Sequence, residues 1–315
     1  MGHGKKSSLK ATLQSQQTRL KIKQKAKHAA EAAEKGKQIK GKGKAPSLRP
    51  TIPFKVTDKI LLIGEGNFSF ARALLVSAPQ SLEHLPPSNI TATAYDSEQE
   101  CYEKYPEAQD IVNILRAKGA HILFGIDATN LEKAQALKGK RWDRIVWNFP
   151  HAGKGITDQD RNILSNQVLI LDFFRSAANC LTLGPIPVIN PSYKRKKKAD
   201  DDDPDNPGND GADSDEEGLP LSEETQAARG TVQITLRNVP PYTAWDIPRL
   251  AKNPPKPTRT GVPSNPRYTL LRSFVFHRTI WKGYEHRMTK GERAHGQGKT
   301  GEGGEDRTWE FCCRD

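Results

Sequence analysis

The stretch Ile60-Leu61-Leu62-Ile63-Gly64-Glu65-Gly66-Asn67-Phe68-Ser69 decides the fold. Its four consecutive apolar residues are typical of a parallel strand that is buried on both faces of a sheet. A turn with two glycines follows, and a helix is predicted to begin at Phe68-Ser69-Phe70, where Ser69 could cap it. A buried strand, a glycine turn and a helix in this order predict the first unit of an α/β domain.

The same alternation of strands and helices continues along the chain. Further buried strands are predicted at 90–95, 121–126, 142–147 and 231–236, and helices at 108–118, 131–137, 159–181 and 243–251. Two late strands, 268–276 and 307–313, are separated by a glycine-rich polar segment, so we expect them to be antiparallel. The predicted fold is a Rossmann-like α/β class I methyltransferase fold, with a seven-stranded, mostly parallel sheet and a C-terminal antiparallel strand pair. A nicotinamide-binding domain tends instead to keep its six strands parallel.

The helix predicted at 159–181 has the strongest periodicity in the chain. Asp158 and Asp160 favour its first turn electrostatically. Apolar side chains recur every three or four positions, which predicts one face packed on the sheet: Leu164, Val168, Leu171, Phe174, Ala178 and Leu181.

Charge divides the 315-residue chain into unlike parts. The formal net charge is +12, and residues 1–50 alone hold 14 basic and two acidic residues, so the remainder is neutral. A block of one charge sign is typical of a disordered arm that binds a polyanion. We therefore predict a disordered basic tail over 1–50 and a Rossmann-like domain over 51–315. A low-complexity basic and acidic stretch over 194–230 is expected to interrupt that domain as a disordered loop.

Several classes of protein are excluded by composition. No apolar run approaches the roughly 20 residues of a membrane helix, so we expect no membrane association. The four cysteines form no C-x-x-C pair, so we expect free thiols in a reducing compartment and no metal site. We expect a monomer.

The first candidate ligand site is the glycine turn with two acids that follow later strands. Glycines allow close approach of a ligand, and a helix start presents free N–H groups. The motif lacks the third glycine of the dinucleotide fingerprint, so a tight turn without a ligand is the alternative. Asp96 and Asp127 end the second and third predicted strands, at the same sheet edge. We expect Asp96 to accept from ribose hydroxyls and Asp127 from an adenine amino group, although either acid could instead cap a helix.

The second candidate site is Asn148-Phe149-Pro150-His151, at the end of the fourth predicted strand. A methyltransferase of this layout places its acceptor there. The motif resembles the Asn-Pro-Pro-aromatic turn of amino-methyltransferases, with departures at its second and fourth positions. Asn148 could orient a base edge, Pro150 would stiffen the turn, and Phe149 could stack on the base or fill the core.

Other polar residues near this turn complete the candidate acceptor site. His151 could accept a proton or hold a carbonyl, because its unperturbed pKa is near neutral. Lys154 and Arg161 suit a phosphate group, or belong to a solvated loop.

Together these motifs resemble a known family over about residues 55–315. The segments that carry the resemblance are Leu62–Phe70, Asn148–Gly153, Asp158–Asn162, Pro241–Trp245 and Tyr284–Arg287. They closely resemble the eukaryotic large-subunit ribosomal RNA uridine-N(3)-methyltransferase family. The resemblance implies an S-adenosylmethionine-dependent enzyme that methylates one uridine of 25S/28S-type rRNA in pre-ribosomal particles of the nucleolus, within the nucleus. It also implies that the cofactor is bound by Gly64, Glu65, Gly66, Asn67, Phe68 and Ser69.

The remaining roles are expectations from position. Asn148 and His151 are the candidate catalytic residues, and Phe149, Pro150, Lys154 and Arg161 the candidate substrate-binding residues. Further base contacts are expected among Tyr242, Trp245, Trp281, Tyr284, His286 and Arg287, although core packing is favoured for the tryptophans. The alternatives are a non-catalytic RNA-binding factor in ribosome assembly and a nicotinamide-dependent reductase. The intact glycine turn with both acids argues against the first, and the missing third glycine against the second.

Overall fold

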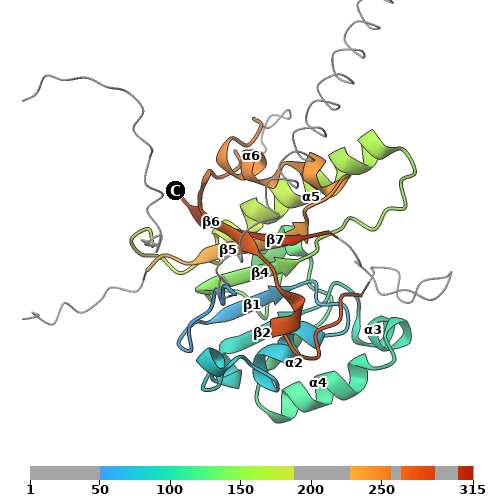
Figure 1. The fold of residues 1–315 in the computed structure, drawn as a ribbon, viewed down its shortest axis with the longest axis vertical. Helices are drawn as coiled ribbons and strands as arrows, with labels where there is room; N and C mark the ends of the chain where they lie inside the picture. The colour runs from blue at the N-terminus through green and yellow to red at the C-terminus, as the bar shows by residue number, and fades with distance from the viewer. Residues whose placement is uncertain (1–49, 188–227, 257–263, 288–303, 315) are drawn as a thin grey trace, which may run out of the picture. The chain divides into compact units, whose positions relative to one another are not determined.

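One seven-stranded sheet organises the molecule, with the strand order β3-β2-β1-β4-β5-β7-β6. The strands are β1 (Ile60–Ile63), β2 (Ile90–Thr93), β3 (His121–Leu123), β4 (Arg144–Asn148), β5 (Thr231–Arg237), β6 (Tyr268–Val275) and β7 (Asp306–Cys313). Strands β1 to β5 pair in parallel, and β7 lies antiparallel between β5 and β6. The predicted mostly parallel sheet with a C-terminal antiparallel pair is therefore confirmed (Figure 1).

This computed structural model describes residues 50–187, 228–256, 264–287 and 304–314. The predicted basic tail lies outside the described residues except for Pro50, and so does most of the predicted loop. The far end of that loop was wrongly placed. Arg229 N donates to Pro185 O at 2.8 Å, and Gly230 N donates to Thr182 O at 2.8 Å. These residues are therefore hydrogen-bonded parts of the fold that lead into β5.

Helices cover both faces of the sheet (Figure 1). The α-helices are α2 (Ser69–Leu75), α3 (Glu98–Lys104), α4 (Ala108–Ala117), α5 (Gln159–Ala178) and α6 (Ile247–Lys252). Short 3-10 turns are η2 (Gln80–Leu82), η3 (Pro87–Asn89), η4 (Ala128–Lys133), η5 (Tyr242–Trp245) and η6 (Arg278–Ile280). In β1, Ile60 and Leu62 pack with α2 and α4, whereas Leu61 and Ile63 pack with α5 and α6. The apolar run of β1 is thus explained by a core on each face.

Helix α5 departs from its predicted packing in its first half. Leu164 and Val168 are 60% and 48% exposed, and Asn166 is buried in their place. Asn166 Oδ1 accepts from Ala152 N at 2.8 Å. The first half of α5 therefore contacts the polar loop that follows β4 through Asn166, and most of the expected apolar face lies in its second half.

Other helices and strands also differ from the predicted ones in extent or type. Helix α3 was not predicted, because only Cys101 of its side chains is buried, and a capping box between Ser97 and Glu100 fixes its start. The strands predicted at 90–95 and 121–126 end early, at Thr93 and Leu123, and Gly125 turns the chain after the second strand with a φ of +67°. The helix predicted at 131–137 is instead the 3-10 turn η4.

All four cysteines are buried and free. None of the helices in the described ranges is long and apolar enough to cross a membrane.

The amino-terminal edge of the sheet is held by a buried charge network around Glu310. The Glu310 side chain is 1% exposed and accepts from Arg144 Nη1 at 3.1 Å, Thr231 Oγ1 at 2.8 Å and Arg272 Nε at 2.6 Å. Arg144 also donates to Asp58 at 3.0 Å. These contacts join β4, β5, β6 and β7 far from the carboxyl edge.

We predict that Glu310→Gln lowers the free energy of unfolding by about 3 kcal/mol, because it leaves two guanidinium groups without their shared buried counter-charge. The control is Glu98→Gln, which removes the charge from an exposed pair with Arg116 and should cost less than about 1 kcal/mol. Urea denaturation measures both values. Equal losses in the two variants would contradict this account of the network.

Candidate functional site

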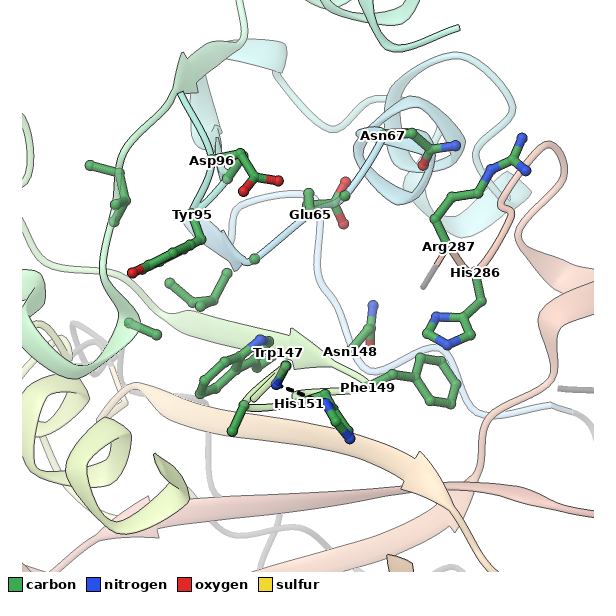
Figure 2. Close-up of a pocket in the computed structure, with 18 of the residues that line it drawn as sticks. Glu65, Asn67, Tyr95, Asp96, Trp147, Asn148, Phe149, His151, His286 and Arg287 are labelled. Carbon is green, nitrogen blue, oxygen red and sulfur yellow. Dashed lines mark hydrogen bonds between the residues drawn. The ribbon is translucent and has the colours of Figure 1, made fainter. Parts of the chain in front are cut away.

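A cavity of about 810 Å³ lies at the carboxyl ends of β1, β2 and β4 (Figure 2). Strands β1 and β4 pair with Ile63 opposite Trp147, so Gly64 and Asn148 enter the cavity from neighbouring strands. The volume is in the usual range for small-molecule sites. The two candidate sites read from the sequence therefore form one site.

Protein packing restricts both glycines of the first turn. Gly64 has a φ of +62°, and a Cβ atom there would lie 2.9 Å from Trp147 Nε1. A Cβ atom on Gly66 would lie 3.2 Å from the Tyr105 ring. Gly64 is therefore required by its backbone conformation and its packing, and the Tyr105 ring leaves little room for a side chain at position 66.

The start of α2 is capped by its own turn, which corrects the expectation of N–H groups open to a ligand. Glu65 Oε2 accepts from Ala71 N at 3.0 Å, and Asn67 Oδ1 accepts from Ser69 N at 3.2 Å. Ser69, the expected cap, is instead the first residue of the helix. Burial raises the pKa of the Glu65 carboxyl to about 7, against the opposing effect of its backbone hydrogen bonds.

The segment Tyr284–Arg287 forms another wall of the cavity and is fastened to the glycine turn. Ser69 Oγ donates to Glu285 O at 3.0 Å and is within 3.1 Å of Glu285 N, which donates to it. Asn67 Nδ2 donates to Glu107 Oε1 at 2.8 Å, and Arg287 Nη2 pairs with that same oxygen at 2.8 Å. Ser69 and Asn67 therefore position a distant part of the chain at the site.

The two acids after β2 and β3 both line the cavity but have different partners. Asp96 Oδ1 accepts from Lys104 Nζ at 2.6 Å. Asp127 caps η4: it accepts from Thr129 N at 2.8 Å and from Asn130 Nδ2 at 2.8 Å. Burial opposes ionisation of Asp127, but these hydrogen bonds lower its pKa overall. Asp127 thus fills the capping role that the sequence left open.

Tyr95 was not predicted as a site residue. It lines the cavity beside Asp96 and is 73% exposed, two positions after the buried strand β2. An aromatic residue just before the acid at a strand end was the signal that could have identified it. An exposed ring at this place can pack against a planar ligand group.

The turn after β4 brings Asn148 and His151 to the cavity, as predicted. Asn148 Oδ1 is buried and has no hydrogen-bond partner within the described ranges. His151 Nδ1 accepts from Gly153 N at 2.9 Å, which leaves Nε2 to carry the proton of the neutral ring. Burial lowers the pKa of His151 and favours that neutral form.

Phe149 supports the far side of this turn. Its φ is +54°, a strained value for a non-glycine residue. Its ring centroid lies 4.4 Å from that of His286 and 6.1 Å from that of Phe276, and the Arg278 guanidinium lies over the ring at 4.9 Å. These contacts give Phe149 a packing role.

Burial, together with the charges of Arg278 and Arg237, lowers the pKa of His286 to about 4, so this cavity residue is neutral.

The other predicted site residues divide into two groups. Gly64, Glu65, Gly66, Asn67, Phe68, Ser69, Phe149, Lys154, Tyr284, His286 and Arg287 all line the cavity. Pro150 and Arg161 do not, since Pro150 is buried and Arg161 is exposed in the first turn of α5. Trp245 and Trp281 are 1% and 2% exposed, so the core packing favoured for them is confirmed. The part of the chain that the structure describes has no cluster of three or more metal-ligating side chains.

Comparison with known proteins agrees with this geometry. A family model described as "BMT5-like: rRNA (uridine-N3-)-methyltransferase BTM5-like" matches residues 61–288. The 25S rRNA (uridine(2634)-N(3))-methyltransferase of Saccharomyces cerevisiae is 30% identical over 77% of this chain and 69% of its own length. The heavy metal-associated isoprenylated plant protein 41 of Arabidopsis thaliana is 25% identical over 75% of this chain and 34% of its own.

A mouse protein, the ferredoxin-fold anticodon-binding domain-containing protein 1 homolog, is 36% identical over 39% of this chain and 18% of its own length. The family match covers the glycine turn, the turn after β4 and the wall segment Tyr284–Arg287. The chain therefore belongs to the BMT5-like family of rRNA (uridine-N3-)-methyltransferases.

Proposed function

We propose that this protein transfers a methyl group from S-adenosylmethionine to ring nitrogen 3 of a uridine in large-subunit rRNA. The observation that carries the proposal is the single cavity bordered by both the glycine turn and the turn from Asn148 to His151. The uridine and the rRNA are suggested by the family description and by the name of the yeast relative.

The cavity walls fit the proposed donor. The volume of about 810 Å³ has room for a nucleoside with an amino-acid side arm beside a nucleobase. The buried Asn148 Oδ1 needs a hydrogen-bond donor, and no described residue provides one. We propose that Asp96 accepts from the ribose hydroxyls and that Tyr95 packs against the adenine ring. The bound cofactor supplies an electrophilic methyl group on a positively charged sulfur.

We propose that the uracil base, which accepts the methyl group, is held along its base-pairing edge. Nitrogen 3 of uracil takes part in base pairing, so the target uridine must be unpaired or flipped out to enter the cavity. We propose that the Asn148 amide hydrogen-bonds this edge and that His151 Nε2–H donates to a uracil carbonyl. Their main contribution is alignment, because methyl transfer requires the attacking nitrogen in line with the breaking bond.

The proton of nitrogen 3 must leave as the new bond forms. Acceptance by His151 Nδ1 would break the hydrogen bond from Gly153 N, and the lowered pKa of His151 opposes it as well. We therefore propose that Asn148 Nδ2 and His151 Nε2 donate to the uracil carbonyls and stabilise the negative charge that develops on them, while water takes the proton.

The test of the function is a reaction with defined components. The full chain is incubated with S-adenosylmethionine and large-subunit rRNA transcribed in vitro, and the digested nucleosides are identified by mass spectrometry. We expect 3-methyluridine that depends on the protein. Donor binding without any methylated nucleoside, over a range of rRNA fragments, would instead support the non-catalytic assembly factor.

We predict that Asn148→Ala lowers the rate of methyl transfer by about 100-fold, because a hydrogen-bonding group at the developing charge is lost. The affinity for S-adenosylmethionine should stay within about threefold, since the proposed contact is made to the acceptor. Arg161→Ala is the control: Arg161 lies outside the cavity and should keep the full single-turnover rate. Single-turnover kinetics at saturating RNA measure both variants. Equal rates for Asn148→Ala and the unaltered chain would contradict the role of Asn148.

We further propose that the basic stretch 1–50 supplies RNA affinity and directs the protein to pre-ribosomal particles in the nucleolus. Deletion of residues 1–50 should weaken rRNA binding and flatten its salt dependence, because fewer phosphates are neutralised. Donor affinity should not change. Filter binding at several salt concentrations and imaging of tagged chains measure the two effects. An unchanged salt slope together with unchanged nucleolar signal would contradict both roles.

A further inference from the structure

Glu65 differs from three of the four other acids on the cavity wall in that it has no cationic partner. Asp96 pairs with Lys104, Asp172 with Arg175 and Glu285 with Arg287, at 2.6 to 2.8 Å. Asp127 is held by the hydrogen bonds of its cap. Across the described ranges, no lysine or arginine forms an ion pair with Glu65. Figure 2 shows its side chain between Asp96 and Asn67, with Asn148 on the opposite wall.

The position of the Glu65 carboxylate is fixed by the fold. It lies between Gly64 and Gly66, whose packing against Trp147 and Tyr105 sets the path of the turn. Its Oε2 atom accepts from Ala71 N at 3.0 Å. Burial without a counter-charge raises the pKa of this carboxyl to about 7. A cation bound in the cavity would supply the missing charge and return the group to its ionised form.

We propose that Glu65 recognises the positive charge of the methyl donor and thereby distinguishes the donor from the product that remains after transfer. The inference rests on the proposed function. In that reaction the bond between sulfur and the methyl carbon breaks, and its electron pair stays on sulfur. The methyl carbon bonds to nitrogen 3 of uracil, whose proton goes to water. The positively charged sulfonium thus becomes a neutral thioether, and the remainder of the cofactor is unchanged.

Loss of that charge explains how one cavity can favour the donor over the product. Contacts to the adenosine and amino-acid parts are the same for both ligands and cannot separate them. Only a group that senses charge at the sulfur can do so, and an unpaired carboxylate does this most directly. Product release after transfer is then assisted, since the carboxylate is again without a counter-charge.

This role of Glu65 makes the affinity for the methyl donor depend on pH, whereas the affinity for the product does not. Between pH 6 and 8 the Glu65 carboxyl passes through its pKa, and a cation binds best to the ionised form. Donor affinity should therefore rise with pH, and binding near pH 7 should release a proton. Among the neighbouring groups, the pKa of Tyr284 is raised far above that range and that of His286 is lowered to about 4, while burial lowers the pKa of His151. The other charged groups on the cavity wall are Asp96, Lys104, Asp127, Lys154, Asp172, Glu285 and Arg287.

Isothermal titration calorimetry tests the proposal with two probes, S-adenosylmethionine and S-adenosylhomocysteine. For the unaltered full chain, donor affinity should rise up to about tenfold from pH 6 to pH 8, the range around a pKa near 7, while product affinity stays flat. At pH 7, buffers of different ionisation enthalpy should reveal proton release on donor binding only.

Glu65→Gln should weaken donor binding roughly tenfold and leave product binding within about twofold, because only the charge contact is lost. The amide oxygen can still accept from Ala71 N, so the turn keeps its cap. Asp96→Asn is the matched control: it should weaken both ligands alike, since both carry the ribose.

Equal weakening of both ligands by Glu65→Gln would overturn the proposal, and so would donor binding that neither depends on pH nor releases a proton. The proton measurement uses the unaltered chain, so it decides the question even where the variant does not fold. Binding of neither ligand to the unaltered chain would overturn the proposed function, and this inference with it. Binding of both with equal affinity would overturn this inference alone.

Discussion

The parallel pairing of β1 with β4 is the constraint on which the site depends. Ile63 lies opposite Trp147, so Gly64 and Asn148 begin their turns side by side, although they are far apart in the chain. The Trp147 indole fills the space beside Gly64, so the packing that fixes the register also fixes the turn. A register shift by one residue would reverse the faces of β1 and lose both cores at once. The position of the cavity is therefore set by the strand pairing of the sheet.

A second set of contacts completes the site from the end of the chain. Ser69 and Glu285, 216 residues apart in sequence, are joined by hydrogen bonds in both directions. This junction holds His286 against Phe149 on the acceptor side of the cavity. Burial lowers the pKa of both cavity histidines, and the other charged groups on the wall are carboxylates, lysines and an arginine.

The sequence predicted the fold well, because consecutive apolar runs such as Ile60–Ile63 identify strands that are buried on both faces. It also located the two turns of the site, since the carboxyl ends of parallel strands meet at one edge. It could not show that Glu65 and Asn67 cap α2 themselves, because the helix start looks the same whether a side chain or a ligand satisfies it. Tertiary context also decided the exposed Val168 and the buried Asn166, where α5 meets a polar loop instead of the sheet.

The most direct test of the account is a crystal structure of the full chain with S-adenosylhomocysteine and a uridine-containing oligonucleotide. We expect adenosine density against Asp96 and Tyr95, and the cofactor sulfur in the same cavity as the uracil. Nitrogen 3 should face that sulfur, with Asn148 on the pairing edge of the base. Density for the cofactor or the uridine outside this cavity, or a uracil that presents another atom to the sulfur, would contradict the central claim that one sheet edge joins donor and acceptor.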